Sequence, residues 1–172
     1  MSEPRSIREL NEDLFDEGTG DRYADPVEAR RKAMDYLARR DYGRGELERK
    51  LTRAGFAADV VADAVARLAD EGLQDDRRYA DSFIQSRIGK GKGPVRIRQE
   101  LIERGIPESA VNEALGERED DWFAMAREIR QKKFGLAPPD DFREKARQMR
   151  FLQYRGFDTA HIQAAVEARG DD

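Results

Sequence analysis

The sequence predicts an all-α protein made of three tandem three-helix repeats, which form an elongated, curved stack. The first observation is a repeat around Gly55, Gly105 and Gly156, which are 50 and 51 residues apart. The second is that apolar residues after each glycine recur at the three- and four-residue spacing of a helix face. The third is composition, because 40% charged and 38% hydrophobic residues suit several small cores with much wetted surface.

Each repeat glycine stands between apolar positions that all three copies share. A leucine lies four residues before the glycine, and Phe or Ile follows directly after it. This order predicts a helix that ends just before a glycine in the left-handed conformation, so that the next residue folds back on the leucine. Three further shared columns follow in the next helix: Val61, Val111 and Ile162, then Ala64, Ala114 and Ala165, then Val65, Leu115 and Val166.

The elements can be placed in order along the chain. Residues 1–25 hold eight acidic side chains against three arginines, and we predict a disordered acidic tail there. The first helix is expected to start at Asp25 as N-cap, with Pro26 at its first position. The three repeats are predicted to span 26–74, 75–118 and 119–170.

The middle helix of each repeat shows one irregular copy. Leu47 and Ile97 are predicted to be buried in the first two copies, whereas Gln148 occupies the same column in the third. We therefore expect Met149, together with Leu152, to replace Gln148 in the third core.

No residue pattern predicts an enzyme, a cofactor or a metal site. The sequence has no Cys, and its one histidine, His161, is expected at the surface or at the core boundary. The acidic runs 75–76 and 119–121 are expected to start helices, where they suit the helix dipole. The segment Gly89–Gly93 lacks the spacing of a phosphate-binding loop, so nucleotide hydrolysis is not expected.

Basic residues gather where the acidic ones are sparse, most clearly between Ser82 and Gln99, which contains no acid. The loop Gly89–Gly93 is either a soluble linker or a contact with a phosphate backbone or an acidic protein groove. Trp122, Phe123 and Phe134 are interpreted as core residues, while the role of Tyr42 stays open. The residues predicted to contact a partner or DNA are Arg39, Arg40, Arg44, Arg87, Lys90, Lys92, Arg96, Arg98, Arg130, Lys132 and Lys133.

Three segments also carry a family resemblance. They are 45–51 (GELERKL), 73–80 (LQDDRRYA) and 91–101 (GKGPVRIRQEL), the first and third followed four residues later by Gly-Phe or Gly-Ile. With these segments in this order, the sequence from about Arg30 to Ala168 resembles the RecX family of bacterial regulatory proteins. The family often has Ser or Thr at the position of Gly45, as the cap of the second helix, and Gly is a tolerable substitute there.

The resemblance implies a function that the residue patterns do not. RecX-like proteins bind the filament that RecA recombinase forms on single-stranded DNA, and they restrain its strand-exchange, ATPase and coprotease activities. The resemblance therefore implies a non-enzymatic regulator in homologous recombination, DNA repair and the SOS response. The alternative is a general nucleic-acid-binding helical module for single- or double-stranded DNA. No signal peptide or membrane span is recognised, so we expect a cytoplasmic monomer.

Overall fold

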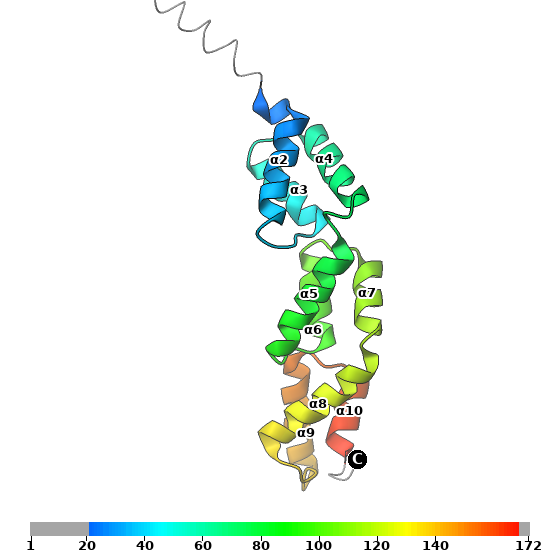
Figure 1. Ribbon diagram of the computed structural model, residues 1–172. Helices are drawn as coiled ribbons and strands as arrows, with labels where there is room; N and C mark the ends of the chain where they lie inside the picture. The colour runs from blue at the N-terminus through cyan, green and yellow to red at the C-terminus, as the bar shows by residue number, and fades with distance from the viewer. Residues whose placement is uncertain (1–20, 169–172) are drawn as a thin grey trace, which may run out of the picture. The chain divides into compact units, whose positions relative to one another are not determined.

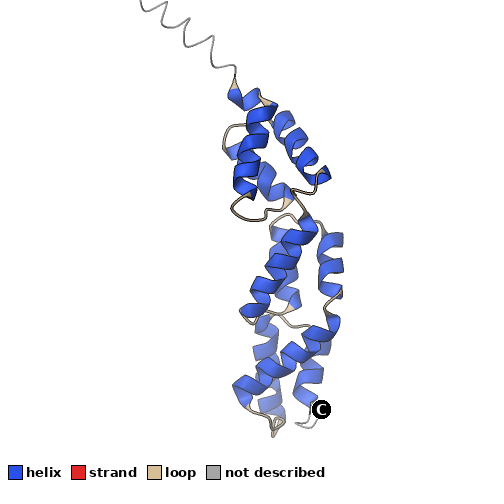
Figure 2. Cartoon of the chain, in the orientation of Figure 1, coloured by secondary structure: helices blue, strands red, loops and turns tan. Residues whose placement is uncertain are grey.

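The computed structural model describes residues 21–168, and every regular element in that range is helical (Figure 2). This confirms the prediction of an all-α fold with three three-helix repeats. The described residues divide into two compact units, 21–75 and 76–168. The first unit contains one set of three helices, and the second contains the other two sets (Figure 1). None of the described helices is long and apolar enough to cross a membrane.

The first unit packs three helices around a small apolar core. They are α2 (Pro26–Leu37), α3 (Arg44–Arg53) and α4 (Ala58–Asp70). As predicted, Asp25 caps α2, and its side chain accepts a hydrogen bond from the backbone N–H of Val27 at 2.9 Å. Gly43, and not Gly45, is the N-cap of α3, so the cap expected at Gly45 is wrong by two residues. The core is made of Ala29, Ala33, Tyr42, Leu47, Leu51, Phe56, Val60, Val61, Ala64, Val65 and Leu68.

Ordered structure begins earlier than the predicted end of the acidic tail at residue 25. The 3-10 helix η1 (Arg22–Ala24) precedes α2, and the Tyr23 carbonyl accepts a hydrogen bond from Ala57 N–H at 2.9 Å. The Tyr23 ring also meets the Phe56 ring edge-on, with centroids 5.6 Å apart. These contacts hold residues 21–25 on the first unit, while residues 1–20 lie outside the described part of the chain.

The second unit joins six helices through one continuous core. They are α5 (Asp76–Gly89), α6 (Pro94–Glu103), α7 (Glu108–Gly116), α8 (Glu119–Phe134), α9 (Phe142–Arg155) and α10 (Thr159–Glu167). Their core contains the fully buried Ile97 and Leu101 of α6 together with Trp122 of α8 and Leu152 of α9. The second and third repeats therefore share one hydrophobic core.

The three repeat glycines end their helices as the sequence predicts. Gly55, Gly105 and Gly156 have φ of +108°, +84° and +95°. In each case the residue after glycine donates its N–H to the carbonyl of the leucine, at 3.2, 3.1 and 3.2 Å. This hydrogen bond defines a Schellman turn, and the paired apolar side chains are buried beneath it.

A backbone contact joins the second repeat to the third. The N–H of Gly93 donates to the Arg155 carbonyl at 2.7 Å, and the N–H of Val95 donates to the Gly156 carbonyl at 2.9 Å. The start of α6 thus meets the end of α9, where unpaired helix N–H and C=O groups are complementary. A Cβ on Gly93 would lie 2.5 Å from the carbonyl carbon of Gly156, so this approach requires glycine.

Candidate partner interface

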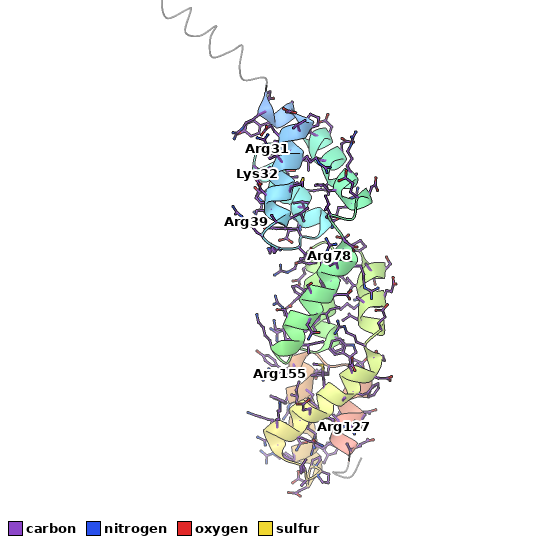
Figure 3. The ribbon with its side chains drawn as sticks, viewed as in Figure 1. Arg31, Lys32, Arg39, Arg78, Arg127 and Arg155 are labelled. Carbon is purple, nitrogen blue, oxygen red and sulfur yellow. The ribbon has the colours of Figure 1, made fainter. Side chains whose placement is uncertain are left out.

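The predicted contact residues of the first unit differ in their exposure and in their ion pairs with other residues of this protein. Arg40 lies 3.7 Å above the Tyr42 ring and binds Glu46 at 2.6 Å, so it braces the loop before α3. Tyr42 itself is only 4% exposed, which settles its open role in favour of the core. Arg44 pairs with Glu48 on its own helix at 3.4 Å. Arg39 is exposed just after α2 (Figure 3).

Two cations of the basic stretch of the second repeat pair with the acidic residue that follows it. Glu100 accepts hydrogen bonds from Arg87 Nε and Lys92 Nζ, both at 2.8 Å. Partial burial alone would raise the pKa of Glu100, but the hydrogen bonds and charges of these two cations outweigh it and lower the pKa. Both cations are mostly buried, with side chains 17% and 22% exposed. Arg87 and Lys92 therefore stabilise the α5–α6 corner before any partner binds.

The remaining cations of that stretch are more accessible. Arg98 donates to the Asn112 side chain at 2.9 Å and also pairs with Glu108 on α7. Arg96 stands 3.9 Å from the shared carboxylate and 5.9 Å from the centre of the exposed Tyr154 ring. Lys90 is exposed in the α5–α6 loop, and no described carboxylate pairs with it.

Arg130 is not on the surface where we predicted it. It is 0% exposed, and its guanidinium donates to the Gln148 side chain at 2.9 Å and to the carbonyl of Ala137. Burial lowers the pKa of Arg130, although an arginine remains charged at neutral pH. Gln148 stays in the core as the partner of this charge, which was not expected, while Leu152 is buried and Met149 packs against the core as expected. A partner cannot reach Arg130 in this structure.

A cluster that the sequence did not predict lies on α8, α9 and the α5–α6 loop. Lys133 Nζ and the Arg155 guanidinium lie 5.7 and 5.4 Å from the centre of the half-buried Phe151 ring. Arg155 (labelled in Figure 3) also donates to the carbonyl of Lys90 at 3.5 Å. We call Lys90, Lys133, Phe151 and Arg155 the Phe151 patch. The four-residue spacing of Phe151 and Arg155 is the one signal that could have indicated it.

The other candidate groups are structural. His161 is 1% exposed, not at the surface, and its Nε2 lies 3.0 Å from a Glu119 carboxylate oxygen. Its ring meets the Phe123 ring edge-on at 4.6 Å, which explains its place in the core. The acids at 76 and 119–121 do start helices α5 and α8, as expected. No three His, Asp or Glu side chains among residues 21–168 are grouped so as to hold a metal ion.

Three family profiles match the chain in order. They are described as the first, second and third three-helix domains of RecX, and they match residues 29–68, 75–115 and 119–166. The chain belongs to the RecX family. Among relatives of this RecX-family protein, "Regulatory protein RecX" of Pseudomonas savastanoi pv. phaseolicola is 46% identical over 147 residues, covering 86% of this chain and 95% of the relative. The Halorhodospira halophila protein of the same name is 44% identical over 140 residues, covering 81% and 87%.

Solved structures agree with this assignment at the level of the fold. The crystal structure of RecX from Lactobacillus salivarius superimposes with a TM-score of 0.73 at 22% identity, over 83% of this RecX-family chain and 94% of that one. A second RecX crystal structure gives a TM-score of 0.71 at 22% identity, over 98% and 81%.

Proposed function

We propose that this protein binds the filament that RecA recombinase forms on single-stranded DNA and restrains its strand-exchange, ATPase and coprotease activities. The supporting observation is family membership along nearly the whole described chain, with all three domains present in order. Relatives at about 45% identity are named regulatory proteins, which favours action by binding over catalysis. We further propose that it acts as a cytoplasmic monomer in DNA repair and the SOS response.

The cations proposed for the partner contact are those that the protein itself leaves accessible. Arg39, Lys90 and Lys133 are exposed and form no ion pair with a described carboxylate. Arg96 is partly exposed and Lys132 is exposed, and both have weak pairs on their own helices, at 3.9 and 3.1 Å. Surface cations of this kind set the rate and salt dependence of association more than its final affinity.

The experiment is a titration of the purified protein into RecA that hydrolyses ATP on single-stranded DNA. We expect hydrolysis to fall at well below one copy of this protein per RecA subunit, because a bound regulator affects many subunits of a filament. An unrelated ATPase that also depends on single-stranded DNA serves as the control, and its rate should not change. Full RecA activity at an equimolar concentration of this protein would contradict the proposal.

A further inference from the structure

We propose that the Phe151 patch is a binding site for a single nucleic-acid strand, with phosphates at Lys90, Lys133 and Arg155 and a base against the Phe151 ring. The proposal concerns naked strand and needs no recombinase, so it goes beyond the filament activity above. It rests on the position of the three cations, on their lack of acidic partners and on the aromatic ring within 6 Å of two of them.

The patch differs in its charge balance from the α5–α6 corner and from the loop before α3. There the cations are paired, with Arg87 and Lys92 on Glu100 and Arg40 on Glu46. Lys90, Lys133 and Arg155 have no carboxylate within ion-pair distance among the described residues. An unneutralised group of cations attracts a polyanion without first having to break an internal ion pair.

The position of the cations suits a strand with regularly spaced charges. Two of them lie within 6 Å of one ring centre, and Arg155 holds the carbonyl of Lys90 at 3.5 Å. The α5–α6 loop is therefore fixed against the end of α9. A Cβ at Gly91 would lie 3.3 Å from Arg155 Nη1, so a glycine at this position allows the guanidinium to approach the loop closely. The structure thus fixes the loop carrying the third cation close to the other two.

The aromatic ring favours a single strand over a duplex. Phe151 is half-buried, and the edge of Phe134 supports it with ring centroids 5.3 Å apart. Phe134 in turn lies under the Arg147 guanidinium at 5.1 Å. Bases of a single strand stack on such rings with little sequence preference, whereas duplex bases are already stacked on each other.

The test is binding of a fluorescent twenty-nucleotide deoxythymidine strand to the full chain, measured by anisotropy across salt concentrations. Changing Lys90, Lys133 and Arg155 to Gln removes three phosphate contacts. Each contact contributes about 0.7 to the slope of log affinity against log salt, so the slope should fall by about two. The same relation gives roughly a hundredfold weaker binding at 0.1 M salt.

A matched variant controls for net charge. Arg30, Arg31 and Arg67 lie in the first unit, are at least partly exposed, and each pairs with an acid, at 2.5, 3.4 and 3.1 Å. Changing these three to Gln removes the same charge, and we expect less than a threefold effect. Equal losses in the two triple variants would overturn the proposal, because they would show only a general attraction. Circular dichroism of each variant, and the single variants Lys90→Gln and Lys133→Gln, guard against misfolding.

The ring and the class of ligand are tested separately. Phe151→Leu keeps an apolar side chain but removes the stacking surface, so binding should weaken roughly tenfold with an unchanged salt slope. Unchanged affinity in this variant would overturn the assignment of a base to the ring. If a decaglutamate peptide competes as effectively as the unlabelled strand, the proposal is overturned and the patch binds an acidic protein segment. If a duplex binds more tightly than the single strand, the proposal is also overturned and the patch is a general electrostatic surface. No RecA is present, so either failure leaves the filament proposal standing.

Discussion

At the scale of single residues, the third repeat keeps a charged group in its core without a counter-charge. Arg130 binds the Gln148 side chain and the Ala137 carbonyl, and its Nη1 has no hydrogen-bond partner among the described residues. The repeat alignment marked Gln148 as irregular, since Leu47 and Ile97 stand in the same column. The alignment did not indicate that Arg130 is the buried partner of Gln148, because the two residues lie on different helices and an arginine is usually exposed.

This pair leads to a prediction about stability. Gln148→Leu should lower the free energy of unfolding by about 1–3 kcal/mol, because it leaves a buried cation with one hydrogen bond fewer. The double variant Arg130→Leu with Gln148→Leu should regain most of that loss, since both polar partners are removed together. Urea unfolding followed by circular dichroism measures both values. A double variant less stable than Gln148→Leu would show that the charge itself stabilises the repeat.

The residue scale also shows why the contact set was only partly predictable. A prediction from charge alone included the exposed Arg39 and Lys90. It also included Arg87, Lys92 and Arg130, whose partners lie within the protein. The distinction depends on which acid stands opposite, and that is set by helix packing rather than by neighbours in sequence.

At the scale of elements, α5, α6 and their loop are joined by one carboxylate. Glu100 lies one residue beyond the acid-free stretch that ends at Gln99, and it binds cations from α5 and from the loop. Two hydrogen bonds from cations lower the pKa of this carboxyl in the folded state. A loop that reads as a mobile basic linker in the sequence is therefore anchored at Lys92.

The lowered pKa predicts how stability depends on pH. A carboxyl with a depressed folded pKa adds stability that is present above its unfolded pKa of about 4.3 and is lost as pH falls through the folded value. Glu100→Gln should therefore cost on the order of 1 kcal/mol at pH 7, and this cost should shrink as the pH falls below about 4. Urea midpoints of the variant and the unchanged protein, measured at pH 7 and at pH 3, give the cost at each pH.

Glu128→Gln is the control, because it removes an exposed pair with Lys132, and its urea midpoint should change little at either pH. A cost for Glu100→Gln that is the same at both pH values would contradict the assigned network.

At the scale of the whole molecule, the repeat predicted the number of three-helix domains but not how they are joined. Identical glycine turns mark three copies, and all three appear in the structure. The sequence did not predict that the second and third copies share one core. Leu101 and Leu152 belong to a leucine column that is the same in all three copies, so it does not indicate which copies pack together. The junction also depends on Gly93, which lies outside the glycine repeat and was interpreted only as part of a basic loop.

Gly93→Ala therefore tests the union of the second and third domains. Its Cβ would overlap the backbone of Gly156, so we expect a loss of about 1–3 kcal/mol in the free energy of unfolding. Trp122, the single tryptophan, lies fully buried in α8 and reports on the third domain through its fluorescence. Because the two domains share a core, a change at the start of α6 should lower the urea midpoint of this fluorescence.

Gly116→Ala, also in the second domain, adds a Cβ with nothing within 4 Å and should leave that midpoint unchanged or slightly raised. A Trp122 midpoint that is unaffected by Gly93→Ala would mean that the third domain unfolds independently of the second.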